Sequence, residues 1–319
     1  MAISAKSRSC LIKAAMLLFL CCLLAFPSAA LSGAKNGLLL WFNQVLPSLL
    51  PFLILSTLFL STGLSDSIAY RLAPVLSPVF RCSPSGCYAV VIGLLAGLPV
   101  GAKTIASLTV SGRITKKEGQ YLLPLCNNPS PLFLLGFISV SVLDQPSLRY
   151  LILFIVILSS VLAAILTRPR DAVSQHTSSY DSRKNSSSRS PFTFSFLLLD
   201  AAIEQAFSVL TKVGGYIILF SVLSSLLTRL PFSAPVIACI GSALEITSGS
   251  ASLAALSLPA SVFIPLVMGF VTFGGLSAAA QTKSVLAGTK FPFAHYLLTK
   301  AIAGLIAGLL MTVCLQLRK

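Results

Sequence analysis

Charged residues are scarce in this 319-residue chain, where Asp, Glu, Lys and Arg together make up 10%. A soluble domain carries roughly 25% of such residues. Hydrophobic residues make up 55% and the mean hydropathy is +0.92. The length alone would suggest two soluble domains of about 150 residues each, but there is too little polar surface to cover them. The composition also excludes a disordered chain. We therefore expect a polytopic membrane protein whose backbone polar groups are satisfied within helices.

Residues that usually perform catalysis or bind metals are also few. The chain has eight acidic residues and two histidines, and His176 and His295 lie in a polar stretch and at the edge of an apolar segment. No triad of nucleophile, base and acid is apparent, so we expect neither an enzyme nor a bound cofactor. The cysteines show no metal-ligand spacing. Scattered through apolar sequence, they are expected to be free thiols.

The formal net charge of +15 would suit a nucleic-acid partner, but no recognition motif or basic–aromatic patch accompanies it. The basic residues lie mainly between apolar segments, where an excess of Lys and Arg marks the cytoplasmic side. Lys6, Arg8 and Lys13 flank the first segment and predict a cytoplasmic N-terminus. The region Leu230–Ala260 has no Lys or Arg and fits the opposite face. The expected partner is therefore the lipid bilayer, and nucleic acid is excluded.

Apolar stretches of about 20 residues can cross a bilayer as helices. The sequence predicts such segments at about Leu11–Leu31, Gly37–Leu64, Tyr88–Leu98, Tyr121–Leu143, Tyr150–Leu166, Phe207–Leu227, Pro235–Leu244, Ser261–Ala280 and Ala294–Leu315. Two of them, Tyr88–Leu98 and Pro235–Leu244, would cross only about half of a ~30 Å core. We interpret each as the first arm of a re-entrant hairpin; the alternative is a full span that continues through the following break. The first segment also resembles a signal peptide.

The two halves of the chain share one pattern of segments. Each half has a long span, a short segment followed by a break, an interrupted span and a closing span. The breaks are Gly97–Lys103 and Leu244–Ser250, and the interruptions are Cys126–Pro131 and Phe273–Thr282. The charges place the halves in opposite orientation. We therefore predict an all-α fold of two inverted-topology repeats, each with a re-entrant hairpin and an interrupted helix, a pattern that points to a transporter's substrate site.

The predicted organisation has four parts. Residues 1–36 form an N-terminal membrane helix, 37–168 the first repeat, 169–192 a cytoplasmic linker and 193–319 the second repeat. The linker is assigned because this stretch is rich in Ser and charge and cannot build a core.

Lys103 is the sharpest candidate for a substrate-binding residue, because a lysine within apolar sequence is costly and usually functional. Gly97, Pro99 and Gly101 precede it and favour an unwound backbone. A helix starting near Ala102 would point free N–H groups into the break, and with the ammonium this forms an anion site. Alternatively, Lys103 snorkels to the interface. The segment is not a P-loop, because Ala102 separates glycine from lysine.

Other polar residues at the breaks complete the candidate site. Asn127, Asn128 and Ser130 would bind substrate or, alternatively, satisfy backbone carbonyls at a kink. Glu245 lies deep in an apolar segment; it would pair with Lys103 or carry a proton, or it is a loop residue on the outer face. The remaining candidates for a polar lining are Thr247, Ser248, Ser250, Gln281 and Thr282.

Three stretches of the chain resemble motifs of the sporulation integral membrane protein YlbJ family. Gly97–Lys103 (GLPVGAK) resembles its G-(Y or F)-P-x-G-A-K motif, although Leu98 stands where the family usually has an aromatic residue. Cys126–Phe133 (CNNPSPLF) is similar to its N-x-x-P-L-F segment, and Leu46–Phe52 (LPSLLPF) to its F-P-x-L-L-P-F run. The resemblance covers about 37–319, and the central loop is shorter than in the family.

The resemblance implies a nucleoside-recognition or Gate domain, which the family shares with concentrative nucleoside transporters and ferrous-iron transport proteins. The two repeats would then be Gate-type repeats. For sporulation members it implies passage of dipicolinic acid, a small aromatic dicarboxylate, across the outer forespore membrane, with other sporulation membrane proteins as partners. We expect a transporter or facilitator of a small organic anion. Two alternatives stay open: a non-transporting scaffold for spore assembly, and a nucleoside carrier.

Overall fold

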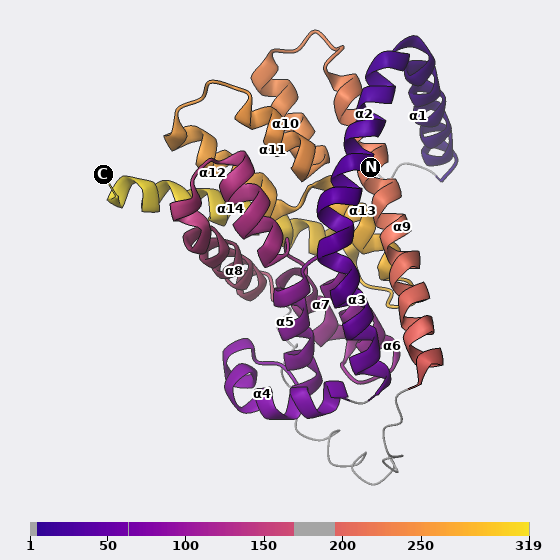
Figure 1. Cartoon of the computed structure of the whole chain (residues 1–319), viewed down its shortest axis with the longest axis vertical. Coiled ribbons are helices and arrows are strands. Elements are labelled where there is room, and N and C mark those ends of the chain that lie inside the picture. The colour runs from indigo at the N-terminus through magenta and orange to yellow at the C-terminus, as the bar shows by residue number, and fades with distance from the viewer. Residues whose placement is uncertain (1–4, 63, 169–194, 319) are drawn as a thin grey trace.

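The computed structural model describes residues 5–62, 64–168 and 195–318, and all regular structure within them is helical (Figure 1). Four helical stretches are long and apolar enough to cross a membrane: Pro146–Leu166, Phe196–Leu227, Ala260–Val285 and Phe293–Leu317. Two bent helix pairs raise the number to six if each pair is one span. The prediction of an all-α, multi-pass membrane protein is confirmed. The predicted linker at 169–192 lies outside the described residues.

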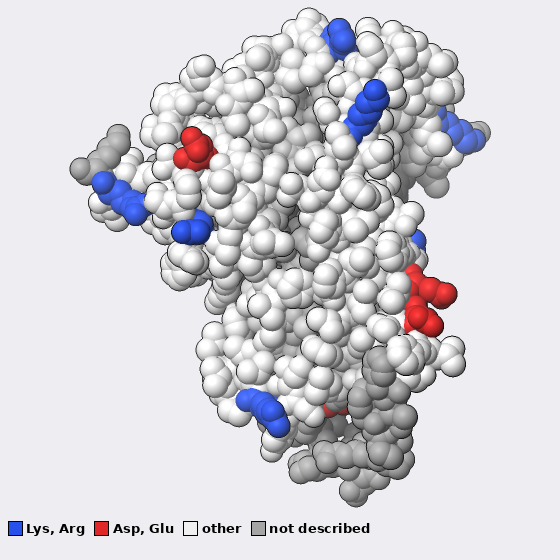
Figure 2. All heavy atoms as spheres, in the orientation of Figure 1, with Lys and Arg blue, Asp and Glu red and all other residues white. Residues whose placement is uncertain are grey.

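The surface has the character expected of such a protein. Charged side chains on the face in Figure 2 are few and are separated by wide uncharged areas. Large apolar side chains are exposed on many helices, for example Leu17, Phe154 and Leu305. Water would make this exposure unfavourable, whereas lipid tails accommodate it.

The N-terminal region differs from the single straight span predicted for Leu11–Leu31. Helix α1 (Ala5–Ala25) and helix α2 (Pro27–Leu40) meet at Phe26, and the pair is bent by 102°. Pro27 starts α2, where its missing N–H costs nothing but prevents α1 from continuing. Helix α2 then runs through a π-helical turn, Trp41–Val45, into α3 (Leu46–Ser61). It therefore crosses residue 36, where the N-terminal part was predicted to end.

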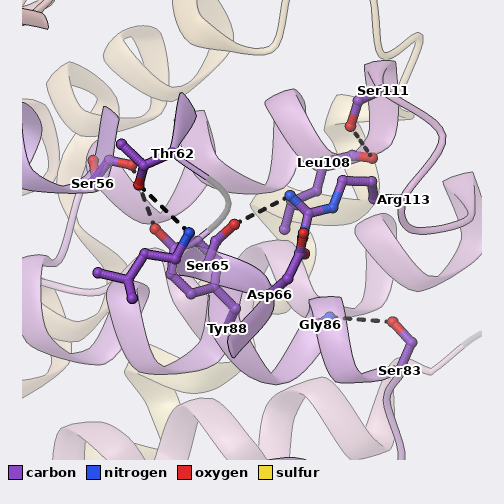
Figure 3. Close-up of polar contacts among 11 residues, drawn as sticks. Ser56, Thr62, Ser65, Asp66, Ser83, Gly86, Tyr88, Leu108, Ser111 and Arg113 are labelled. Atoms are coloured by element: carbon purple, nitrogen blue, oxygen red, sulfur yellow. Dashed lines mark hydrogen bonds and ion pairs between the residues drawn. The ribbon is translucent and has the colours of Figure 1, made fainter. Parts of the chain in front are cut away.

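Helix α4 (Leu64–Phe80) lies between the segments predicted from the sequence, of which Gly37–Leu64 ends where it begins. It is bent by 93° from α3 and lies across one end of the molecule (Figure 1). Arg113 holds the start of α4 by an ion pair with Asp66 and a hydrogen bond to Ser65 Oγ (Figure 3). The buried side chains of Ala69 and Phe80 join the hydrophobic core.

Both short segments turn out to be first arms of hairpins. Helices α5 (Pro84–Ala96) and α6 (Val100–Val110) pack on each other, as do α10 (Ala234–Leu244) and α11 (Ile246–Ala254). A methyl group on Gly101 would lie 3.1 Å from the Gly93 Cα, although eight residues of straight helix span about 12 Å. A methyl group on Gly249 would likewise overlap Ser242. The chain folds back at both breaks, so the alternative of a full span is wrong.

Both predicted interruptions are present. Helix α7 (Lys116–Cys126) ends before Asn127, and the chain becomes helical again before the π-helical Phe133–Val142. Helix α12 (Ala260–Phe273) and helix α13 (Gly275–Val285) are separated by Gly274, which has φ +93°. The second interruption is shorter than predicted, because Gln281 and Thr282 lie inside α13. Glycine tolerates this left-handed conformation, which explains the position of the break.

Long helices complete the bundle: α8 (Arg149–Leu166), α9 (Phe196–Leu227) and α14 (Phe293–Leu317). Small residues allow the closest approaches. Ala29, Gly33 and Gly37 face α9, and Ser225 Oγ donates to the Ala29 carbonyl at 2.8 Å. Helix α14 approaches α12 at Gly304, where a methyl group would lie 2.6 Å from the Gly269 carbonyl oxygen. Such small-residue contacts are typical of helices packed in a membrane.

Candidate functional site

In each half of the chain, the hairpin turn packs against the interruption of the next span. In the first half, Leu98 N donates to the Asn128 carbonyl at 2.7 Å, and a methyl group on Gly97 would lie 2.6 Å from Ser130 N. In the second half, a methyl group on Gly275 would lie 3.2 Å from the Leu244 carbonyl oxygen. The four breaks therefore form two pairs, one from each half.

A small cavity of about 60 Å³, open to the outside, lies where these pairs meet. The first half contributes Leu98, Pro129, Ser130 and Phe133 to its wall. The second half contributes Glu245, Thr247, Gly274, Ser277 and Gln281. Leu49 of α3 and Val213 and Ile217 of α9 line it as well. The remaining lining residues are Gln44 and Val45 of the π-helical turn, Ile246 and Ala278. The structure thus brings together four residues that the sequence singled out: Ser130, Glu245, Thr247 and Gln281.

Glu245 holds the start of α11. Its Oε1 accepts from Thr247 N at 3.0 Å, and its Oε2 accepts from Ser248 N at 2.7 Å and Ser248 Oγ at 2.8 Å. The carboxylate is buried, and its oxygens satisfy N–H groups that a helix start leaves without partners. Its negative charge is therefore offset by the helix to which it belongs.

Two further helix starts face the cavity. Helix α13 begins at Gly274, with no side-chain cap found in the described residues, and Gly274, Ser277 and Ala278 of its first turn line the cavity. In the first half, Ser130 Oγ accepts from Phe133 N at 3.3 Å where the second arm begins. Helix starts carry partial positive charge and free N–H groups, which favour an anion.

Lys103 lies elsewhere, and the predicted Lys103–Glu245 pair is wrong. The Lys103 ammonium donates to Gln205 Oε1 at 3.1 Å and to Thr57 Oγ1 at 3.5 Å, on α9 and α3.

The other predicted residues of the first break do not offer polar side chains. Instead, they let the backbone of the hairpin come close to the backbone of the interruption. Gly97 has φ +74°, and a methyl group on Gly101 would overlap the Cys126 carbonyl oxygen. Pro99 precedes the first turn of α6. Leu98 is the residue of this motif that lines the cavity. This role was not predictable from the sequence, because an apolar side chain carries no chemical signal.

Asn127 and Asn128 lie behind the cavity wall in a buried polar network. Asn127 Nδ2 donates to Thr282 Oγ1 and to Tyr296 OH, both at 2.7 Å. Asn128 Oδ1 accepts from Ser160 Oγ at 2.7 Å and from Lys300 Nζ at 2.8 Å. The network joins the interruption of the first half to α13 and α14 of the second.

Lys300 is the residue that the sequence interpretation undervalued. It is not among the substrate-binding residues predicted from the sequence. In the structure it is 1% exposed and lies on α14, which packs against α8 and α7. The signal was available, since Lys300 interrupts the apolar run Ala294–Leu315 and a lysine in such a run is functional by default.

The fold and the cavity define an integral, multi-pass helical membrane protein whose broken helices enclose a polar site. The chain is a homologue of "Sporulation integral membrane protein YlbJ" from Bacillus subtilis (strain 168). The two are 26% identical over 345 residues, covering 95% of this chain and 81% of the relative, which confirms the resemblance seen in the three motifs. No family model matches the chain. No solved structure matches it.

Proposed function

We propose that the protein is a transporter or facilitator of a small organic anion. The observation that carries the proposal is the cavity between two pairs of broken helices, with Ser130 from one half and Glu245, Thr247 and Gln281 from the other in its wall. Secondary transporters bind substrate at such a place, because unwound backbone supplies polar groups inside the membrane.

An inverted repeat would explain why one pair of broken helices from each half meets at the cavity. Each half runs through a hairpin, an interrupted span and a closing helix, in that order. In each half the hairpin turn contacts the interruption, through Leu98 and Asn128 in one and Leu244 and Gly275 in the other. Alternating access then needs only a rocking of one repeat against the other around the shared cavity.

The anionic character of the substrate is supported by the helix starts. The first turn of α13 and the arm that follows Ser130 both face the cavity, and both favour negative charge. Glu245 does not oppose this, because its oxygens are bound by its own helix. A planar dicarboxylate would be held between these two positive ends.

Dipicolinic acid is the first candidate for the substrate, and sporulation is the process in which we propose that the protein acts. The relative's name describes a sporulation membrane protein, and the motif resemblance implies dipicolinate and the outer forespore membrane. The N-terminus would then be cytoplasmic, as the flanking Lys and Arg residues indicate. Gly97, Pro99, Gly101, Asn127, Asn128 and Ser248 would support the site from behind.

The direct test is uptake of labelled dipicolinate into liposomes containing the purified protein, with and without a proton gradient. We expect uptake above that of protein-free liposomes, and little uptake of a nucleoside. Nucleoside uptake without dipicolinate uptake would favour the nucleoside carrier. Uptake of neither, by a protein shown to be folded, would contradict transport and favour a scaffold role in spore assembly.

A further inference from the structure

Lys300 is a buried cation with an incomplete set of partners. Its side chain is 1% exposed, and the acceptor found for its ammonium is Asn128 Oδ1 at 2.8 Å. A protonated lysine has three N–H donors, so two remain for another acceptor. Within the described ranges, the ion pair found is Arg113–Asp66, at the start of α4. The charge of Lys300 is therefore not balanced by a carboxylate of that part of the chain.

Such an arrangement is costly unless something else balances it. An unpaired buried charge strongly destabilises a fold, and the hydrocarbon of a membrane offers no group that could pair with it. The network contains a second incomplete group, since Asn127 Oδ1 is buried without a hydrogen-bond partner in the described residues. Both observations indicate a site that is completed by a ligand.

The position of the network links it to the cavity. Asn128 is followed directly by Pro129 and Ser130, which line the cavity, and Thr282 follows Gln281, which lines it from the other half. Lys300 therefore lies behind the part of the wall that belongs to the two interruptions. These are the segments that a rocking motion of the repeats would move.

We propose that Lys300 is the counter-cation of the transported anion. A carboxylate of the ligand accepts the N–H groups that Asn128 leaves free, and Asn128 and Ser160 are positioning residues that aim the ammonium. The proposal rests on the proposed function, and it transfers to Lys300 the role that the sequence assigned to Lys103. Its ligand class is a carboxylate anion.

The competing explanation is that Lys300 only fastens α14 to the first interruption. The two explanations predict opposite effects of Lys300→Met, which keeps the length of the side chain and removes its charge. If Lys300 only holds α14 in place, Lys300→Met loses that contact and the protein unfolds at a lower temperature. An unbalanced charge would be relieved, since replacing buried charges by apolar side chains is often neutral or stabilising.

The experiment compares wild type, Lys300→Met, Lys300→Arg and Lys103→Met in detergent and in liposomes. Thermal unfolding is measured alone, with dipicolinate and with the neutral pyridine-2,6-dicarboxamide, because a ligand that binds the folded state raises the unfolding temperature. We expect dipicolinate, and not the diamide, to stabilise wild type and Lys103→Met. We expect Lys300→Met to unfold no earlier than wild type and to bind dipicolinate about 30-fold more weakly or worse, with Lys300→Arg in between.

Three results would overturn the proposal: early unfolding of Lys300→Met, dipicolinate binding that Lys300→Met retains, or no stabilisation of wild type by any carboxylate. The uptake measurement distinguishes a failure of the Lys300 proposal from a failure of the proposed transport function. Equal uptake by wild type and Lys300→Met would contradict the counter-cation role of Lys300 but would still support the proposed transport function. If dipicolinate stabilises the protein only when Lys300 is present, but is not taken up into liposomes, the result would support anion binding by Lys300 and contradict transport.

Discussion

Lys300 and Asn128, 172 residues apart in the sequence, are joined by a hydrogen bond of 2.8 Å between Nζ and Oδ1. The bond connects the last helix of the chain to the first half's interruption. It places a positive charge directly behind the cavity that we propose to hold the substrate.

Replacing Asn128 by Asp tests whether the positive charge of Lys300 must be free to bind the substrate anion. The new carboxylate would pair with Lys300, so we expect dipicolinate uptake to fall at least about tenfold, since charge-assisted pairs contribute about 1.5–3 kcal/mol. Asn128→Asp also loses the bond from Asn128 Nδ2 to the Leu125 carbonyl. Ser160→Ala removes the other donor to Asn128 Oδ1 and leaves the charges unchanged. Because it affects only the positioning of Asn128, we expect it to lower uptake less than Asn128→Asp does. Uptake by Asn128→Asp equal to that of wild type would count against the proposed role of Lys300.

Gly101→Ala tests the close approach of the first hairpin to the end of α7. The added methyl group would overlap the Cys126 carbonyl oxygen, and forced overpacking costs typically 1–3 kcal/mol or more. We expect a clear drop in the unfolding temperature. Gly136→Ala is the control, since a methyl group there meets nothing within 4 Å. Equal unfolding temperatures for the two variants would show that the breaks are not packed as described.

Glu245→Ala tests the capping role of this carboxylate. Loss of a helix cap costs about 0.5–2 kcal/mol, so the variant should unfold earlier than wild type. Glu245→Gln keeps one acceptor oxygen for the N–H groups of Thr247 and Ser248, and we expect it to lose less stability. If both variants retain wild-type stability and Glu245→Gln abolishes uptake in a proton gradient, Glu245 acts as a proton carrier and not mainly as a cap.

Asp66→Asn breaks the ion pair with Arg113 at the start of α4. The Asp66 side chain is 67% exposed, and exposed ion pairs contribute about 0–1 kcal/mol. We therefore expect thermal unfolding and uptake to remain near wild type. A large loss of stability would show that this pair, and not the packing of α4 on α5, holds the end of the molecule together.

The sequence predicts the breaks of this fold well. Glycine at 97 and 274 and proline at 129 cannot continue regular helix at low cost, so their positions mark the turns and interruptions. The length of Tyr88–Leu98 likewise predicts a hairpin, which the structure contains. No apolar segment is predicted over α4, whose sequence includes Asp66, Arg71, Pro74 and Pro78.

The partners of the candidate residues were not predictable in the same way. Lys103 and Lys300 both interrupt apolar sequence, yet one lies beside Gln205 and Thr57 and the other beside Asn128. The difference comes from how α6 and α14 pack against distant segments of the chain. Periodicity within one segment carries no information about that packing.

The cavity itself is tested most directly by filling it. Ser277 lies in its wall, whereas Ser252 is exposed on the neighbouring helix α11, so Ser277→Phe and Ser252→Phe make the same change inside and outside the proposed path. The measurement is uptake of labelled dipicolinate into liposomes by the two variants, with folding checked by thermal unfolding. The account predicts that Ser277→Phe abolishes uptake and Ser252→Phe retains it. Wild-type uptake by a folded Ser277→Phe protein would contradict the claim that the substrate passes through this cavity.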